Sequence, residues 1–428
     1  MKTAFALVAV LCAGNAYAQK IFDVRDYGAK GDGVTLDTAA IQKALDECGK
    51  SGSGTVRFSA GTYLSQPIQI RTKTTIELDA GATLQATTNQ LDFMKSPGVW
   101  YKAPKGSFIP FVSGKDLTDV TFTGGGTIDG SGSAWWGEAE LARQRVPGYT
   151  LPRPNLVVLQ RCQNVRMENI TLQNSPAFNF GPDECENVVV TNVTILNPAH
   201  SANTDGIDPA NCKNVLITKC RIDTGDDNIA IKSGHKVAGR DFAIEDITVT
   251  DCTFLHGHGM SIGSETLGGV HNVTVKNCAF ENTENGIRIK SQRGKGGLVE
   301  NIVYEDITMT NVDPAVTFTC YYSYSSAHDP VQKPVPQNDK AEPMAEGTPV
   351  FRDIHVKNLT ATCQQEAGTI IGLPESCISN VTFENVKISA VSGMKITNAK
   401  GIEFKNSDVT VTKGPSAILH DAEVKGLE

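Results

Sequence analysis

A short pattern, apolar-x-apolar-x-x-apolar or cysteine, recurs along most of this chain. Its copies start at residues 165, 188, 215, 247, 273, 302, 354, 381 and 402, and "IELDAG" at 76 and "VTFTGG" at 120 look like earlier members. The steps between the nine starts are 23, 27, 32, 26, 29, 52, 27 and 21 residues, so the step of 52 corresponds to about two ordinary steps. A repeat joined by loops of variable length is typical of a solenoid.

Within each copy, apolar and β-branched residues alternate, which predicts strands, and the Asn, Asp and Gly between copies predict turns. Two or three short strands per repeat fit one coil of a parallel β-helix, whose coils hydrogen-bond to each other and bury their inward side chains. A β-sandwich is the alternative, but it gives no reason for one pattern to recur nine times. We therefore predict an all-β, right-handed parallel β-helix.

One amphipathic helix is predicted, over residues 36–48, with Asp37 or Thr38 as its N-cap. A solenoid must cover its open ends, so we expect this helix to plug the N-terminal end. Helical periodicity is nearly absent after residue 50, and Trp135 and Trp136 are expected on a Gly/Ser-rich loop.

The first residues, "MKTAFALVAVLCAGNAYAQ", are typical of a secretory signal peptide, with a lysine, a short apolar run and Ala16-Tyr17-Ala18 before the cleavage site. We expect a signal peptide over 1–18, one domain over 19–428, and a protein that is secreted, or periplasmic in a Gram-negative cell. No later run is apolar for long enough to span a membrane. The net charge of −8 argues against nucleic acid as a partner, and we expect a monomer.

Ten cysteines follow the signal peptide, and two interpretations of them stay open. An even number in a secreted chain favours disulfides. Several of them, however, occupy equivalent places in the repeat, as in "RCQNV", "ECENV" and "NCKNV", where they would stack as small buried thiols. No CxxC sequence occurs, so a zinc site is not supported.

A second strand in each of five coils can be aligned on its first apolar residue. These anchor residues are Ile207, Ile229, Met260, Ile287 and Val316. Asp205, Asp227 and His258 stand two positions before their anchors, and Arg288 and Lys290 stand one and three positions after theirs. Because adjacent coils lie about 4.8 Å apart, we expect these residues, with Asp226, to form one cluster across four successive coils.

The position just before the anchor is Gly206, Asn228, Gly259 and Gly286 in successive coils. Glycine, with Asn as its substitute, suits a backbone with positive φ. Such a bend would bring the Asp/His column onto the same face as Arg288 and Lys290.

Close carboxylates raise each other's pKa, which suits one to act as a protonated acid beside an ionised base. Paired acids of this kind catalyse glycoside hydrolysis. A neighbouring Arg and Lys would hold a substrate carboxylate.

Four motifs in this order, "NTD" (203–205), "GDD" (225–227), "GHG" (257–259) and "RIK" (288–290), resemble those of the pectin-degrading polygalacturonases. The resemblance extends over residues 150–325, and "FDVRDYGAKGDGVTLDTAAIQKAL" is similar to the N-terminal segment of pectin-acting β-helices. The wording "GHGMSIGSETLGGVHNVTV" and "NGIRIKS" is most similar to bacterial secreted endo-acting members.

The resemblance implies hydrolysis of α-1,4-linked galacturonan with inversion, without a metal or other cofactor, on polygalacturonate or pectin. It makes Asp226 the general acid, with Asp205 and Asp227 activating water and His258 orienting or tuning the acid. It makes Arg288 and Lys290 the ligands of the galacturonate carboxylate, and Tyr321, in "TCYYSY", a substrate contact. The column itself contains Asp227 and not Asp226, so spacing alone leaves acid and base unassigned.

Several neighbouring residues have plainer interpretations. Asp in such turns usually bonds nearby backbone, and we expect this of Asp208 and Asp223. Lys232 is either a solvated residue or a further cationic contact. Trp135 and Trp136 either stack on sugars or anchor their loop. The Pro-rich segment 321–349 is either a flexible excursion or a cleft wall.

The repeated Asn-x-Thr sequences at residues 169, 192, 272, 358 and 380 are glycosylation acceptors or turn asparagines, and their fixed place in the repeat favours turns.

Rival functions are an exo-acting polygalacturonase, a calcium-dependent pectate lyase with Asp205, Asp226 and Asp227 around the ion, a rhamnogalacturonan hydrolase, and a non-catalytic polysaccharide-binding β-helix.

Overall fold

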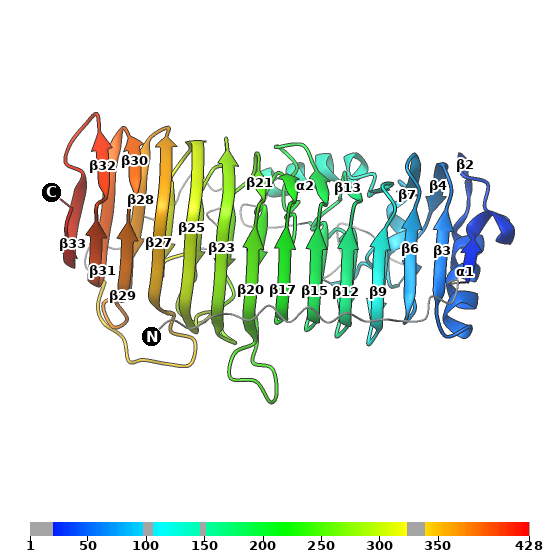
Figure 1. The fold of residues 1–428 in the computed structure, drawn as a ribbon, viewed down its shortest axis with the longest axis horizontal. Helices are drawn as coiled ribbons and strands as arrows, with labels where there is room; N and C mark the ends of the chain where they lie inside the picture. Colours follow the sequence, from blue (N-terminus) through cyan, green and yellow to red (C-terminus); the bar gives the residue numbers. More distant parts are fainter. Residues whose placement is uncertain (1–19, 97–105, 146–150, 323–338, 428) are drawn as a thin grey trace, which may run out of the picture.

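The computed structural model describes residues 20–96, 106–145, 151–322 and 339–427. Parallel strands wind into a long β-helix, with the N-terminal coils at one end and the C-terminal coils at the other (Figure 1). The predicted fold is confirmed. The proposed signal peptide, residues 1–18, lies outside the described residues.

Three ladders of strands run along the β-helix. The first is made of β1 (Ile21–Asp23), β3 (Gly54–Phe58), β6 (Thr74–Leu78), β9 (Thr118–Thr123), β12 (Gln163–Glu168), β15 (Glu186–Thr191), β17 (Lys213–Thr218), β20 (Ile244–Thr250), β23 (Val270–Glu281), β25 (Leu298–Val312), β27 (Val350–Cys363), β29 (Ile378–Glu384), β31 (Ser392–Lys405) and β33 (Ala417–Lys425).

The second ladder shares the long strands β23, β25 and β27 with the first. Its other members are β2 (Asp32–Leu36), β4 (Gly61–Ser65), β7 (Ala82–Ala86), β10 (Thr127–Asp129), β13 (Thr171–Gln173), β16 (Thr194–Leu196), β18 (Arg221–Asp223), β21 (Thr253–Phe254), β30 (Lys387–Ala390) and β32 (Asp408–Val411).

The third ladder carries the aligned anchor residues. It contains β5 (Ile68–Gln69), β8 (Val112–Lys115), β11 (Val157–Gln160), β14 (Phe180–Asp183), β19 (Ile229–Ile231), β22 (Met260–Gly263), β24 (Ile287–Lys290), β26 (Val316–Thr319) and β28 (Glu366–Ile371), and it continues through the first part of β31 to β33. Ile207 bridges both Phe180 and Ile229, which joins β14 to β19 through a coil that has only isolated bridges there.

The first ladder pairs the repeat copies as aligned, from Val120 through Val165 to Ile402. Two details of the alignment were wrong. Ile76 pairs with Phe122, two residues beyond the aligned Val120. Ile302 pairs directly with Ile354, so the 52-residue step is one coil with a long excursion, and not two coils. Hydrogen bonding between neighbouring coils sets the pairing. The number of residues between two repeat copies therefore does not give the number of coils between them.

The turn interpretation of the repeated asparagines is confirmed. Asn169, Asn192, Asn272, Asn358 and Asn380 all have φ between 52° and 55°. Some bond along the stack, as where the Asn192 amide donates to Asn169 Oδ1 at 2.8 Å. Asparagine tolerates this left-handed backbone, and its amide can donate to one coil while accepting from another.

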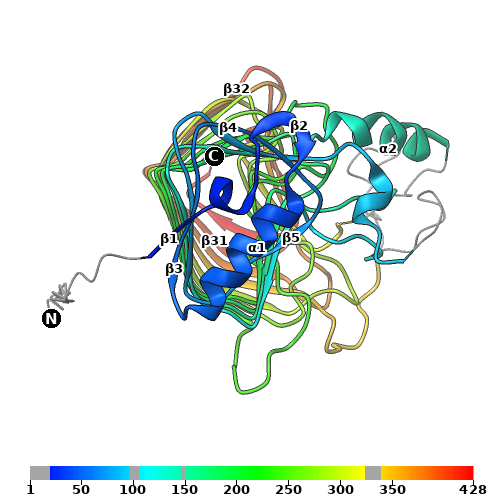
Figure 2. The ribbon, with the colours of Figure 1, turned by 90° about the vertical axis from the view of Figure 1, so that its right-hand side faces the viewer.

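The N-terminal end is covered by α1 (Thr38–Lys50), preceded by the 3-10 helix η1 (Val24–Tyr27) (Figure 2). Ile41, Ala44, Leu45 and Cys48 form its buried face, as expected. Asp37 stands at the N-cap position, but its side chain makes no cap hydrogen bond. Its carboxylate accepts instead from the backbone amides of residues 30 and 31, because the preceding loop folds over it.

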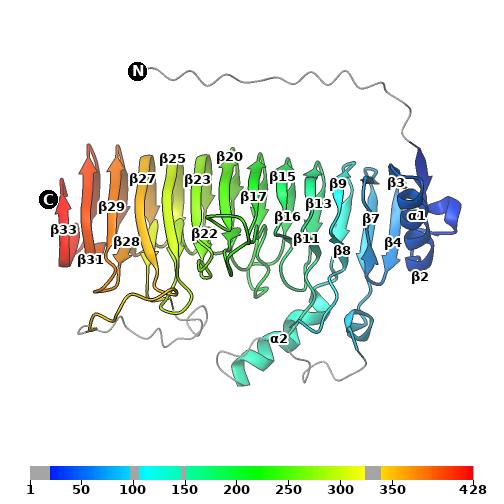
Figure 3. The ribbon, with the colours of Figure 1, turned by 90° about the horizontal axis from the view of Figure 1, so that it is seen from below.

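A second helix, α2 (Ser133–Arg145), was missed, because we placed Trp135 and Trp136 on a loop. It projects from the long side of the β-helix on which β11 and β22 lie (Figure 3). Trp135 is fully buried, edge-on to Phe93 of the 3-10 helix η2 (Gln90–Phe93) and to Phe108. It therefore anchors the helix, which lacks the regular apolar stripe that would reveal a helix in the sequence.

The ten cysteines among the described residues are free, and eight of them are buried. Cys162, Cys185 and Cys212 stack in successive coils, and the thiol sulfurs of Cys185 and Cys212 accept from the backbone amides one coil earlier. The structure thus favours core thiols over disulfides.

The positive-φ explanation of the glycine column was wrong at three of its four positions. Gly259 has φ 73°, whereas Gly206, Asn228 and Gly286 do not have positive φ. Glycine is needed at two of these positions because the backbone of the next coil lies very close. A Cβ on Gly206 would lie 2.4 Å from the Asn228 carbonyl oxygen, and one on Gly286 would lie 2.4 Å from that of Ala315. The neighbouring coil's backbone passes where a side chain would start.

We expect Gly286→Ala to lower the free energy of unfolding by about 1–3 kcal/mol, since its Cβ would overlap both backbone and the Met309 side chain. Urea denaturation measures this. Gly181→Ala in β14 is the matched control, because the closest atom to its Cβ would be 3.9 Å away. Equal stability of the two variants would contradict the close-approach explanation.

Candidate active site

The site is assembled by the third ladder. Ile207, Ile229, Met260 and Ile287 pair in sequence, as the alignment predicted. The turns before these anchors carry Asp205, Asp226, Asp227 and His258, while β24 itself carries Arg288 and Lys290. All six of these predicted site residues are buried.

Asp227 is held by both cations of β24. Its Oδ2 accepts from Lys290 Nζ at 2.7 Å, and its Oδ1 is paired with the Arg288 guanidinium. Ser261 donates to the same Oδ1 at 3.0 Å and accepts from Arg288 Nε at 2.9 Å. Burial raises the pKa of Asp227, but Arg288 and Lys290 outweigh it, so the pKa of this carboxyl lies below its usual range.

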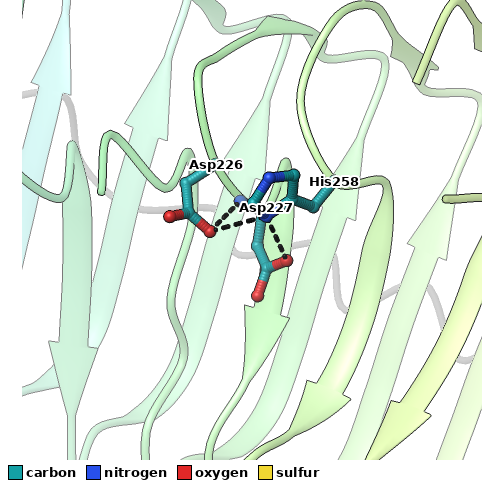
Figure 4. Close-up of side chains that lie close together, drawn as sticks. All are labelled: Asp226, Asp227 and His258. Atoms are coloured by element: carbon teal, nitrogen blue, oxygen red, sulfur yellow. Dashed lines mark hydrogen bonds and ion pairs between the residues drawn. The ribbon is translucent and has the colours of Figure 1, made fainter. Parts of the chain in front are cut away.

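Asp226 forms a separate ion pair with His258, whose Nδ1 lies 3.0 Å from Asp226 Oδ1 and 3.8 Å from Asp227 Oδ1 (Figure 4). The Asn203 amide donates to Asp226 Oδ2 at 3.3 Å. On its other side, His258 Nε2 lies 3.1 Å from Glu284 Oε2. The imidazole therefore bridges a buried carboxylate and an exposed one.

Asp226 and His258 share a proton, and in the site without substrate this proton resides on His258. Burial alone would lower the pKa of His258, but Asp226 and Glu284 raise it to about 9. Burial likewise raises the pKa of Asp226, and the positive charge of His258 more than reverses this, so the net direction is downward. A proton is thus stored beside Asp226 at neutral pH and is lost only as the pH rises through about 9.

Asp205 belongs to a third charged group, with Asp208 and Lys232. Lys232 Nζ lies 3.5 Å from Asp205 Oδ2 and 3.4 Å from Asp208 Oδ2. Burial, followed by the charge of Asp208, raises the pKa of Asp205 well above its usual range. Burial also raises the pKa of Asp208, to about 7, although Lys232 opposes it.

The expectation that Asp208 bonds nearby backbone was wrong: among the described residues, neither of its carboxylate oxygens has a hydrogen-bond partner, and its contact is the Lys232 ion pair. Asp208 stands one position after its anchor, like Arg288, and so points into the site.

Lys232 aligns with Lys290 two coils later, which makes it the further cation and not a solvated residue. Asp223 stays outside, paired with His256.

The structure places Tyr322, and not Tyr321, beside the charged cluster. Tyr321 donates from its hydroxyl to Asp339 at 2.6 Å, in a network with Arg293, and so turns away from the charged cluster. Tyr322 has its ring 5.0 Å from Lys290 Nζ instead. Successive residues of an extended segment point to opposite faces, so only one of the pair can face the site.

Ser261 and Glu284 also contact the predicted site residues, although neither was predicted from the sequence. Ser261 could have been found, because it occupies the same aligned position as Arg288 one coil earlier. Glu284 lies in the turn before the anchor Ile287, and no spacing rule singles it out.

Asp226, Asp227 and His258 are close enough to offer three ligand atoms to one metal ion. The donor set does not suit calcium, which takes six to eight oxygen ligands. Both oxygens of Asp227 already face Arg288 and Lys290, whose charges would repel a cation. The described residues therefore fit a metal poorly.

We expect Lys232→Met to lower the free energy of unfolding by about 3–5 kcal/mol near pH 8, because it leaves Asp205 and Asp208 buried without a counter-ion. The folded-state pKa of both acids would rise further above the unfolded value. The loss should therefore shrink as the pH falls from above 7 towards 4, where both states become protonated.

Urea denaturation of the wild type and of Lys232→Met from pH 4 to pH 8 measures how their difference in free energy of unfolding depends on pH. Lys236→Met is the matched control, since that lysine is exposed and pairs with exposed Glu346. A loss independent of pH would show that Lys232 acts through packing alone.

Comparison with known proteins agrees with this geometry. The chain matches the family model "Glycosyl hydrolases family 28" over residues 48–411. It is 33% identical over 385 residues to an endo-polygalacturonase of Pectobacterium carotovorum subsp. carotovorum, covering 86% of this chain and 88% of that one. It is also 33% identical to a probable polygalacturonase of Vitis vinifera, over 92% of this chain and 80% of the relative.

Solved structures give the same result. The polygalacturonase from Erwinia carotovora ssp. carotovora superimposes with a TM-score of 0.72 at 31% identity, over 86% of this chain and 94% of that one. An exopolygalacturonase from Thermotoga maritima has a TM-score of 0.71 at 26% identity, over 92% and 91% of the two chains. With a family model that spans most of its length and relatives at this identity, the chain belongs to glycosyl hydrolase family 28.

Proposed function

We propose that this protein is a polygalacturonase that cleaves the α-1,4-galacturonosidic bonds of polygalacturonate or pectin with inversion. The observation that carries the proposal is the adjacency of two buried ion pairs, Asp226 with His258 and Asp227 with Arg288 and Lys290. One supplies a proton and the other offers cations to an anionic sugar. The polygalacturonase names of the relatives agree with this substrate.

In the mechanism we propose, water bonds to C1 of one galacturonate as the bond from C1 to the leaving oxygen breaks. Asp226 protonates the leaving oxygen, using the proton that it shares with His258. Asp227 accepts the proton of the attacking water from the opposite face, and Asp205, whose pKa is raised, shares this role only in its ionised form. Asp226 gives up one proton and Asp227 takes up one. Return of a proton to Asp226 and loss of one from Asp227 restore the starting charges of the site.

Substrate binding would also activate Asp227. In the free site, Arg288 and Lys290 hold its pKa low, which makes it a weak base. A galacturonate carboxylate that binds the two cations would share their charge, and the pKa of Asp227 would rise. Tyr322, against Lys290, takes the substrate-contact role in this proposal in place of Tyr321.

We further propose endo-action, because the relative named endo-polygalacturonase is matched over most of both chains. Exo-action is the second candidate, since a structure of similar fold is named an exopolygalacturonase. A calcium-dependent lyase is disfavoured by the cations around Asp227. A binding-only role leaves the buried acids without a purpose.

Localisation, oligomeric state and partners are also matters of proposal. We propose a secreted monomer without metal or nucleic acid, whose residues 19–428 act as one catalytic domain after removal of residues 1–18. The acidic net charge of −8 agrees with the absence of nucleic acid. Across the part of the chain that is described, no helix has the length and apolarity to cross a membrane.

We expect Asp226→Asn to lower the release of reducing ends from polygalacturonate by roughly 10²- to 10⁴-fold, since the amide cannot donate an acidic proton. Asp223→Asn, outside the site, is the matched control. Both variants should still be folded without denaturant, as shown by a cooperative urea transition, and wild-type activity should survive EDTA. Unsaturated products that disappear with EDTA would support a lyase instead.

Product sizes over time test the mode of action. We expect mixed oligomers at the earliest times from unesterified polygalacturonate, measured by anion-exchange chromatography. Monomer or dimer alone from the start would contradict endo-action.

A further inference from the structure

A pocket of about 660 Å³ opens beside the acid. One wall is a face of α2, with Trp136 and Glu140 four residues apart, and the other wall is the loop that carries His200 and Ala202. Gly225 completes the lining. Of the residues that line this pocket, Trp136 was given two alternatives from the sequence, stacking on a sugar or anchoring its loop, and the others have had no role so far.

Two of the residues that line the pocket are direct sequence neighbours of site residues. Gly225 directly precedes Asp226, and Ala202 directly precedes Asn203, whose amide donates to Asp226. Its walls come from coils earlier than that of His258, whereas Arg288 and Lys290 come from a later one. The coil that carries the acid therefore lies between the coils of the two walls and the coil of the two cations along the axis of the β-helix.

The lining suits the apolar face of a sugar ring. Trp136 is half-buried, and its indole Nε1 donates to the Ser175 carbonyl at 3.0 Å, which fixes the ring in place. His200 is exposed and stands edge-on to it, with ring centroids 6.3 Å apart. A fixed aromatic ring offers flat contact area at little entropic cost, and the Glu140 carboxylate can accept hydrogen bonds from sugar hydroxyls.

We propose that this pocket binds a pyranose ring of the substrate chain, on the side of the scissile bond opposite to the ring held by Arg288 and Lys290. The inference rests on the proposed function and deepens it. With the pocket on one side of Asp226 and the two cations on the other, a polysaccharide chain can bind across the site. Contacts to sugars remote from the reacting bond then contribute to the rate. The pocket thereby favours internal cleavage of long chains.

The test uses end-labelled galacturonate oligomers of increasing length, with wild type, His200→Ala, Trp136→Ala and the control Leu141→Ala, an exposed residue of α2 outside the pocket. For the first two variants, we expect the ratio of kcat/KM on long oligomers to that on the shortest cleaved oligomer to fall roughly three- to tenfold. The labelled cleavage site should shift as well. Leu141→Ala should keep the wild-type ratio.

An unchanged ratio in His200→Ala would overturn the proposal even if Trp136→Ala disturbed α2, because His200 is exposed and its removal leaves no cavity. An equal loss at every length would also overturn it, since that pattern indicates damage to the acid. Wild type that cleaves no oligomer would instead contradict the proposed function itself.

Discussion

The in-register pairing of consecutive coils is the constraint on which the rest of the structure depends. Each strand of a coil hydrogen-bonds to its counterparts in the coils before and after, as Ile229 pairs with both Ile207 and Met260. These pairs, which are 22 and 31 positions apart in the sequence, are thereby held at the spacing of neighbouring strands. Loops can vary in length without disturbing this pairing, as the long excursion between Ile302 and Ile354 demonstrates.

This geometry concentrates charge that no single segment could hold. Four aspartates, a histidine and two cations are buried along the third ladder, with the half-buried Lys232 beside them, and each acid finds its counter-ion in another coil. Burial raises the pKa of every one of these acids, and the partner decides the outcome: downward for Asp226 and Asp227, upward for Asp205. Three carboxyls of one residue type thus differ in their affinity for a proton.

The sequence predicted the strand repeat, the N-terminal helix and the alignment of the anchors, because each depends on the spacing of apolar residues along the chain. It did not predict α2, whose buried Trp135 packs against Phe93 and Phe108 rather than in a regular stripe. It also gave the wrong reason for the glycine column, because the close approach at Gly286 depends on the backbone of the next coil.

By itself, the sequence determined which residues share a column, since the coils pair in register and the columns follow from the pattern alone. Only the tertiary structure decided how each side chain is used: Tyr322 and not Tyr321 beside Lys290, Asp208 paired with Lys232, and His258 set between Asp226 and Glu284. The direction of a side chain in a turn depends on backbone dihedral angles, and here packing against the neighbouring coils fixes those angles.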